Sequence, residues 1–179
     1  MNTEQIRRTT LRRIAAVILI TTIAVAATTE VPAQAKIGST LPNFKLADQK
    51  KRTWRRTNFA SKPVLYVACD REAYDYVDNW TKQLVPKYRN DIHFVPIADL
   101  STAPDFLKGY IRDRFDDEFT YPVLMDWAGK LVKLLGIKEG YPTLVITTAA
   151  GKITYQAWGK GSASQVGRLD AKLAEITGK

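Results

Sequence analysis

The sequence is poor in the residues that carry most side-chain catalysis: its 179 residues include one cysteine and one histidine. A single cysteine excludes an intrachain disulfide, a Cys-x-x-Cys redox pair and a zinc site built from cysteines. A single histidine excludes histidine-rich metal centres and argues against most histidine-dependent hydrolases. We therefore expect no resident metal and no cofactor. The sequence indicates fold and location more clearly than function.

Lysine and arginine outnumber the acidic residues, 27 to 18, and 45% of the residues are hydrophobic. This length and composition predict a globular chain with one core. Five cationic residues gather around Trp54: Lys50, Lys51, Arg52, Arg55 and Arg56. A basic stretch with an aromatic residue can contact nucleic acid or an anionic surface. A solvated hairpin explains the same pattern, so we expect no nucleic-acid partner and keep contact with an anionic envelope surface as the alternative.

Residues 1–35 have the pattern of a secretory signal peptide. A basic segment containing Arg7-Arg8 precedes the apolar run 14–29, and the small-residue site Ala33-Gln34-Ala35 follows. This pattern predicts cleavage after Ala35, a mature domain over residues 36–179 and a periplasmic or secreted location. The alternative is a membrane anchor, but the run is short for a span of about 20 residues. Membrane contact is thus expected only before cleavage, and both Sec and twin-arginine export stay open.

Hydrophobic periodicity alternates between strands and helices along the rest of the chain. Apolar or two-residue-periodic runs predict strands near residues 44–46, 64–69, 92–98, 122–125, 143–148 and 153–158. Apolar residues at helical spacing predict helices at residues 70–86, 103–116 and 130–135, and a last helix after the capping box Ser162–Gln165. Pro96 indicates an edge position or an irregular end for its strand. This order predicts an α/β domain in which helices flank both faces of a mixed sheet.

Four segments carry a family resemblance in their order and spacing. They are the opening Ile37–Leu46 with its Leu-Pro-x-Phe-x-Leu pattern, the strand Lys62–Ala68, the segment Tyr121–Asp126 and the loop Gly140–Leu144. Together they resemble the thioredoxin-like superfamily, in particular its redoxin or peroxiredoxin-like branch. The resemblance covers nearly all of residues 36–179. It implies a thioredoxin-like fold and a cis peptide bond before Pro142, facing the active-site turn.

The cysteines that carry the redox chemistry of that superfamily are missing from this sequence. Aligning the strand that ends at Ala68 places the family's two active-site cysteines at Arg71 and Tyr74. The Cys-x-x-Cys motif therefore reads Arg71-Glu72-Ala73-Tyr74 in this chain. Dithiol–disulfide exchange needs an attacking thiolate and a second thiol that resolves the mixed disulfide. The sequence thus predicts a member without dithiol redox activity.

Cys69 lies two residues before the expected nucleophile and permits three interpretations. It is an inert apolar residue at the end of a buried strand, a reactive thiol, or one half of an intermolecular disulfide. The reactive interpretation places it at a helix N-terminus beside Arg71, where both features would lower the pKa of the thiol. In that case the protein would be a one-cysteine thiol peroxidase or thiol oxidoreductase acting through Cys69.

The favoured hypothesis is a protein- or peptide-binding module. Active relatives bind extended polypeptide in a groove beside the active-site turn and the proline loop, and the resemblance places five residues in that groove: Arg71, Tyr74, Tyr141, Pro142 and Thr143. Arginine and tyrosine are common interface anchors, so an acidic or extended peptide is the expected partner.

Overall fold

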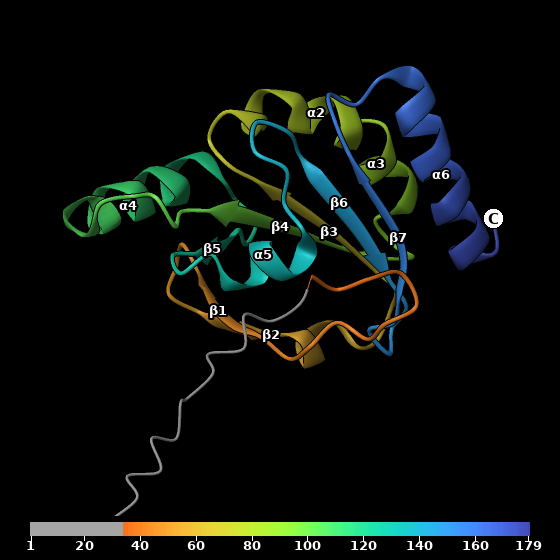
Figure 1. Ribbon diagram of the computed structural model, residues 1–179, viewed down its shortest axis with the longest axis horizontal. Helices are drawn as coiled ribbons and strands as arrows, with labels where there is room; N and C mark the ends of the chain where they lie inside the picture. Colours follow the sequence, from red (N-terminus) through yellow and green to blue (C-terminus); the bar gives the residue numbers. More distant parts are fainter. Residues whose placement is uncertain (1–33) are drawn as a thin grey trace, which may run out of the picture. The chain divides into compact units, whose positions relative to one another are not determined.

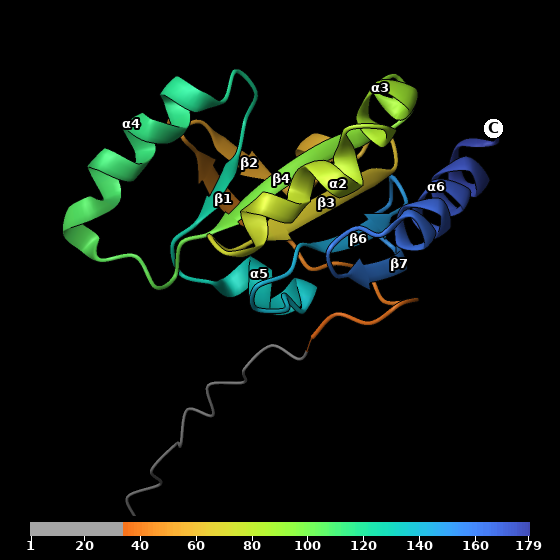
Figure 2. The same ribbon diagram turned by 90° about the horizontal axis from the view of Figure 1, so that it is seen from above.

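A computed structural model describes residues 34–179, which build one seven-stranded sheet with helices on both faces (Figures 1 and 2). The strands are β1 (Lys45–Asp48), β2 (Thr53–Arg55), β3 (Val64–Cys69), β4 (His93–Asp99), β5 (Leu124–Asp126), β6 (Thr143–Thr147) and β7 (Ile153–Trp158). The α-helices are α2 (Val77–Thr81), α3 (Leu84–Tyr88), α4 (Lys108–Glu118), α5 (Lys130–Leu135) and α6 (Ala163–Thr177). Short 3-10 turns are η1 (Arg56–Phe59), η2 (Ala73–Tyr76) and η3 (Asp105–Leu107).

The strand order β2-β1-β5-β4-β3-β6-β7 is mixed, as the sequence predicts. The three central strands β3, β4 and β5 run parallel, so their carboxyl ends meet at one edge of the sheet. The hairpin of β6 and β7 joins β3 antiparallel, with Ala68 opposite Thr143. This register brings the turn after β3 next to the loop that precedes β6.

Successive side chains of β3 point to opposite faces of the sheet, so this strand contributes to the core on both faces. Val64, Tyr66 and Ala68 pack on the face covered by α5. Leu65 and Val67 pack on the opposite face, which is covered by α2, α3 and α6. All five are buried, since this strand lies in the interior of the sheet with helices on both sides.

The first predicted helix is broken into η2, α2 and α3. Asp70 caps its start as expected, because its carboxylate accepts a hydrogen bond from the N–H of Ala73 (2.8 Å). Pro86 does not end the helix: it lies at the third position of α3, where a missing N–H costs nothing. The remaining helices begin and end close to their predicted bounds, and the capping box of Ser162 and Gln165 is present.

Of the two interpretations of Pro96, an edge position or an irregular end, the edge position is wrong, because β4 is an interior strand. The pairing of β4 with β5 begins only at Ile97, so no β5 residue lies opposite Pro96. At Pro96, β4 therefore has a neighbouring strand on one side only. Proline has no N–H to donate, and this position resembles an edge strand, where none is needed.

The expected signal segment lies almost wholly outside the described residues. Ala35, the residue before the predicted cleavage point, is buried and packs in the core beside α5. Its N–H donates to the carbonyl of Leu134 (2.9 Å), and its carbonyl accepts from the side chain of Gln156 (3.0 Å). Within residues 34–179, no helix is both long and apolar enough to cross a bilayer.

The cationic residues around Trp54 form the hairpin that the sequence predicts, and several have partners. Lys50 pairs with Asp116 of α4 at 3.3 Å, and Arg52 pairs with the buried Asp48 at 2.8 Å. Arg56 donates to the carbonyl of Ala150 (2.9 Å), whereas Lys51 and Arg55 are exposed. Contact of this hairpin with an anionic surface stays a prediction.

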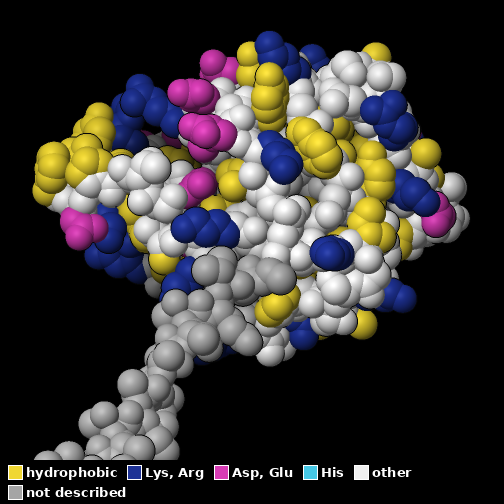
Figure 3. All heavy atoms as spheres, viewed as in Figure 1, with side chains coloured by type: hydrophobic (Ala, Val, Ile, Leu, Met, Phe, Trp, Pro, Cys, Tyr) yellow, Lys and Arg dark blue, Asp and Glu magenta, His cyan; other side chains and the backbone are white. Residues whose placement is uncertain are grey.

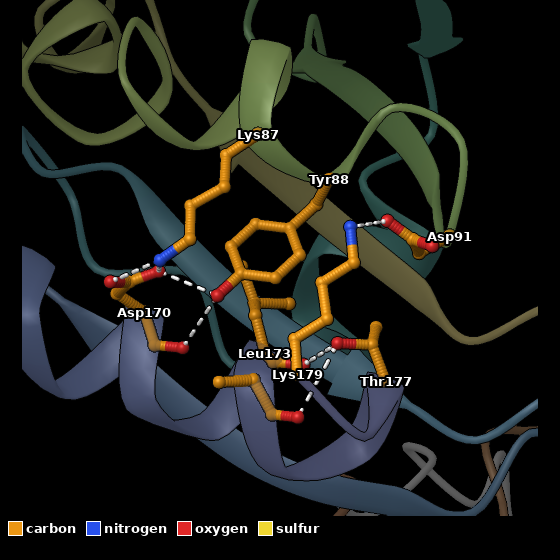
Figure 4. A network of polar contacts seen from close by, with 8 residues as sticks. Lys87, Tyr88, Asp91, Asp170, Leu173, Thr177 and Lys179 are labelled. Carbon is orange, nitrogen blue, oxygen red and sulfur yellow. Dashed lines mark hydrogen bonds and ion pairs between the residues drawn. The ribbon is translucent and has the colours of Figure 1, made fainter.

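A polar network fastens α6 to α3 (Figure 4). The hydroxyl of the buried Tyr88 donates to the Asp170 carboxylate at 2.6 Å, and the Lys87 ammonium donates to the same carboxylate at 2.7 Å. Hydrogen bonds from Lys87 and then from Tyr88 hold the pKa of Asp170 below its ordinary value.

The lowered pKa of Asp170 predicts a loss of stability in acid. Because the folded-state pKa lies below the unfolded value of about 3.9, the stabilisation is complete above that value and is lost as the pH falls through the folded pKa. We expect Asp170→Asn to be less stable than the wild type at pH 7 by about 1 kcal/mol, with the gap closing toward pH 2. Urea unfolding at a series of pH values measures this gap. A constant gap at every pH would contradict the assignment.

Candidate functional site

The turn after β3 and the loop before β6 form one surface, and Asp70 joins them. One carboxylate oxygen of Asp70 accepts from the N–H of Ala73, and the other accepts from the N–H of Gly140, both at 2.8 Å. Gly140 has φ +73°, a left-handed conformation that glycine adopts without strain. The two segments that the family resemblance pairs are therefore held together by a single aspartate. The sequence analysis assigned Asp70 only the capping half of this role.

The proline loop differs from the expectation in two respects. No peptide bond among residues 34–179 is cis, so the implied cis bond before Pro142 is wrong. The chain instead reverses at Gly140 within a short bridge between Lys138 and Tyr141, and it enters β6 with a trans bond, the isomer that the amide itself favours.

Pro142 and Thr143 are buried, so neither lines a surface. Thr143 begins β6, which pairs with a strand on each side. Its hydroxyl accepts a hydrogen bond from the N–H of Lys138 (3.1 Å). Both residues shape the loop rather than offer contacts to a ligand.

Arg71 is exposed on the turn, as expected, but Tyr74 turns away from the proline loop. The Tyr74 hydroxyl donates to the Glu118 carboxylate at 2.7 Å, and its ring packs edge-on against Phe119, 6.2 Å between centroids. The hydrogen bond to Glu118, together with burial, raises the pKa of Tyr74. Tyr74 therefore belongs to the contact between the turn and α4.

Tyr76 takes the place that Tyr74 was expected to fill. Its ring stacks on the ring of Tyr141, with centroids 6.4 Å apart and an interplanar angle of 25°. The Lys160 ammonium lies 5.1 Å from the centroid of Tyr76, and the Lys138 ammonium lies 5.4 Å from the centroid of Trp158. We call these five residues the aromatic–lysine surface. Tyr76 was missed because the groove residues were chosen by aligning the Cys-x-x-Cys motif, which selects Tyr74, and the chain forms a 3-10 turn here.

A pocket of about 340 Å³ opens beside this surface, between the end of β7 and the first turns of α6. It is lined by Trp80, Tyr155, Gln156, Ala157, Trp158, Gln165 and Arg168. Trp158 is thus shared by the pocket and the aromatic–lysine surface. Arg168 is exposed and forms no ion pair with another residue of the described part.

Cys69 ends β3, half-buried beside the same edge of the sheet. Burial first, and then the nearby Asp70 and Asp99 carboxylates, raise the pKa of its thiol to about 12. The one-cysteine hypothesis expected the opposite direction from Arg71 and a helix N-terminus. Burial of the sulfur and the two carboxylates act against the thiolate that this hypothesis needs, and the hypothesis stays a prediction.

We expect Cys69 to react slowly with iodoacetamide. At pH 7.5 a thiol of pKa about 12 has on the order of a thousandfold less thiolate than a free cysteine of pKa about 8.5. Alkylation of the folded protein, followed by mass spectrometry, should therefore be at least about a hundredfold slower than that of the urea-unfolded chain. Equal rates in the two states would show that the thiol is neither buried nor electrostatically suppressed.

Within the described residues, no three histidine, cysteine or acidic side chains gather as a metal ion would require. The acidic groups near Cys69 have backbone partners instead. Asp99 accepts from the N–H of Ser101 (3.0 Å) and Asp70 from the two amides already described. The described site combines aromatic rings, cationic side chains and one thiol of raised pKa with Asp70, which joins its two segments.

No protein-family model and no curated protein matches the chain. Solved structures do match it. A proposed thiol:disulfide interchange protein DsbE from Chlorobium tepidum has 18% identity and a TM-score of 0.62, covering 80% of this chain and 99% of its own. The exposed lipoprotein thioredoxin Etrx1 from Streptococcus pneumoniae has 17% identity and a TM-score of 0.60, covering 75% and 100%.

A thiol peroxidase from Chromobacterium violaceum is similar as well, with 18% identity, a TM-score of 0.57, and coverage of 79% of this chain and 88% of its own. At these identities the likeness concerns the fold. The chain has the thioredoxin-like fold of redoxin proteins, and the predicted fold class is confirmed.

Proposed function

We propose that this protein is a thioredoxin-fold binding module that holds an extended, acidic polypeptide on its aromatic–lysine surface. The observation that carries the proposal is the arrangement of Tyr76, Tyr141 and Trp158 with Lys138 and Lys160. Tyr141 is 39% exposed and Trp158 is 53% exposed, so two large rings meet solvent beside cations. Tyrosine and tryptophan are typical anchors of protein interfaces, and the ammonium groups beside them can donate charge-assisted hydrogen bonds to carboxylates.

The charges of this surface favour an acidic partner. Neither Lys138 nor Lys160 forms an ion pair with another described residue; each ammonium lies over an aromatic ring instead. Arg71 on the adjacent turn and Arg168 at the pocket are exposed as well. A carboxylate of the ligand would gain a charge-assisted hydrogen bond at any of these groups without breaking an existing ion pair.

The surface is also held in place before a ligand arrives. Asp70 fixes the turn to the proline loop, and the indole N–H of the buried Trp80 donates to the carbonyl of Gly159 (2.8 Å) behind Trp158. A preorganised surface loses less conformational entropy on binding. The chain has one cysteine with a raised pKa, so the proposed role involves no dithiol exchange.

The proposal includes export of the protein to the periplasm or the exterior. Its support is the basic, apolar and small-residue pattern of residues 1–35. Among the structurally similar proteins, one is described as an exposed lipoprotein. N-terminal sequencing of the protein recovered from cells tests export directly. A start at Lys36 would support cleavage after Ala35, whereas an intact Met1 would contradict it.

Binding is tested with two fluorescently labelled peptides of equal length and aromatic content, one rich in glutamate and one rich in lysine. We expect the glutamate-rich peptide to bind more tightly in fluorescence anisotropy. We expect the double variants Tyr141→Ala/Trp158→Ala and Lys138→Glu/Lys160→Glu each to weaken that binding by at least about tenfold.

The matched control is Lys133→Glu/Lys152→Glu, which makes the same charge change at exposed lysines of α5 and of the β6–β7 turn. Binding by the control should stay within about threefold of the wild type, because net charge alone acts weakly at a distance. Equal losses in both lysine double variants would place the peptide elsewhere. Failure of the wild type to bind either peptide up to about 1 mM would reject the proposal.

A further inference from the structure

Strand β7 is an edge of the sheet, and only the first half of its outer side has a partner. Ile153 donates its N–H to the carbonyl of Ser39 (2.9 Å), and its carbonyl accepts from the N–H of Gly38 (2.8 Å). In the same stretch, Thr40 forms a bridge with Lys152. Beyond this point, no backbone segment in the described part of the chain pairs with the outer side of β7. The second half of β7 is therefore an open edge.

The register of the β6–β7 ladder shows which backbone groups of this half point outward. The N–H of Gly159 donates to the carbonyl of Pro142 (3.3 Å), and hydrogen-bonded residues alternate along an antiparallel ladder. Counting back from Gly159, the backbone groups of Gln156 and Trp158 point away from β6. The Trp158 carbonyl agrees with this direction, because it accepts from the side chain of Gln165 in α6 (3.0 Å). The N–H and carbonyl of Gln156 and the N–H of Trp158 have no hydrogen-bond partner among residues 34–179.

This open edge lacks the features that keep sheet edges from pairing. Residues 153–158 contain no charged residue and no proline. The irregularity in the ladder lies at Ile146–Thr147, opposite the first half of β7, where the edge is already covered. Unpaired N–H and carbonyl groups on an uncharged edge strand are a template for a further strand.

A pocket and unpaired cations lie along the same edge. The pocket of about 340 Å³ between β7 and α6 is lined by the exposed guanidinium of Arg168 and by no carboxylate. Ala157 packs in the core beneath α6, so Trp158 points to the other face of the sheet, where Lys138 lies over its ring. Figure 3 shows basic and hydrophobic side chains together on the side of β7 and α6, whereas acidic side chains gather toward α4.

We propose that an acidic polypeptide binds as an eighth strand along the second half of β7. The inference rests on the proposed function and specifies how the ligand is held: its backbone pairs with Gln156 and Trp158. Side chains of an added strand alternate between the two faces, so its carboxylates reach Arg168 on one face and Lys138 on the other. Backbone pairing requires only an extended ligand, and the cations supply the preference for acidic residues.

A second copy of the chain suits this edge less well. Two-fold pairing of β7 with β7 of a copy would bring together two sets of the same cations, among them Arg168 and Lys138. An acidic ligand instead places carboxylates beside them. Because Trp158 also belongs to the aromatic–lysine surface, one extended ligand can contact that surface and the open edge.

Hydrogen exchange of the wild-type protein tests the pairing directly. With the glutamate-rich peptide at saturation, we expect amide exchange at Gln156 and Trp158 to slow by at least about tenfold, because both N–H groups gain an acceptor. The amides of Tyr155 and Ala157 already face β6 and should change less. Unchanged exchange at Gln156 and Trp158 in a saturated complex would overturn the inference and leave the proposed function in place.

Substitution of Gln156 supplies a second measurement. Because its N–H points outward, Gln156→Pro removes this donor and blocks the edge without removing a bond to β6. Gln156→Ala is the comparison, because it loses the same side chain, including its hydrogen bond to Ala35, but keeps the N–H. In fluorescence anisotropy we expect the proline variant to bind the glutamate-rich peptide at least about tenfold more weakly than the alanine variant does. Equal affinities of the two folded variants would contradict strand addition.

Two further outcomes separate the inference from its alternatives. If circular dichroism shows that the proline variant is unfolded, the exchange measurement on the wild type decides alone. A wild type that binds neither peptide would reject the proposed function and the inference with it. Exchange at Gln156 and Trp158 that slows with protein concentration in the absence of peptide, together with a dimer in sedimentation velocity, would overturn the inference and assign the edge to a second copy.

Discussion

Replacing Trp80 with alanine is expected to lower the free energy of unfolding by about 3 to 5 kcal/mol. Trp80 is fully buried and lies in the core on the face covered by α2, α3 and α6. A Cβ atom added at Gly161 would come within 2.9 Å of the indole, so the backbone of the loop before α6 packs directly against this ring. The substitution would leave a cavity between α2 and that loop, which the sheet cannot close.

Trp80→Phe separates the effect of side-chain volume on stability from the effect of the indole hydrogen bond. It retains most of the apolar contact but removes the indole N–H that donates to Gly159, so we expect a smaller loss of about 1 to 2 kcal/mol. Urea unfolding followed by circular dichroism measures both variants. A loss for Trp80→Ala below about 1 kcal/mol would show that the site collapses around the missing ring.

Replacing Asp126 with alanine is expected to cost about 3 to 4 kcal/mol, because one buried carboxylate serves three backbone donors. Asp126 ends β5 and is completely buried. Its two oxygens accept from the N–H groups of Lys130, Leu131 and Val132 at 2.7 to 3.2 Å, which are the first donors of α5. Two of these residues are themselves buried, so water cannot replace the lost acceptor.

The matched variant is Asp126→Asn, which keeps one of the two acceptor oxygens and replaces the other with an NH2 group that cannot accept. We expect a loss of about half that of the alanine variant. Both losses should be accompanied by faster hydrogen exchange at the amides of Leu131 and Val132, relative to amides in α6. If exchange rises equally in both helices, Asp126 would stabilise the whole fold rather than α5.

Most of the fold could be predicted because local and global preferences agree. Continuous apolar runs gave β3 and β6, the glycine after Leu135 ends α5 with φ +71°, and the capping box starts α6. The edge position inferred from Pro96 was wrong, because a rule about where single prolines occur in strands cannot show that β5 is short. The position of β1 and β2, at the far side of β5, depends on pairings distant in sequence and was beyond local patterns.

The candidate site was predicted in part. The turn after β3 and the proline loop do meet, but the residues that form the surface differ from those expected. Tyr74 and Tyr76 are two residues apart, and only the 3-10 turn decides which of them faces Tyr141. The raised pKa of Cys69 comes first from burial and then from Asp70 and Asp99, and the last of these belongs to another strand. Such details depend on residues that are far apart in the sequence and close together in the fold, and a single sequence does not show which residues these are.

The position of β3 in the sheet has a consequence for the order in which the protein is made. β3 lies between β4 and β6, yet β6, β7 and α6 are the last elements of the chain. β3 therefore lacks its neighbour β6, and the core that it shares with α2 and α3 lacks α6, until the C-terminus, including Lys179 and its contact with Asp91, has been synthesised. Folding of this domain is then largely a post-translational event.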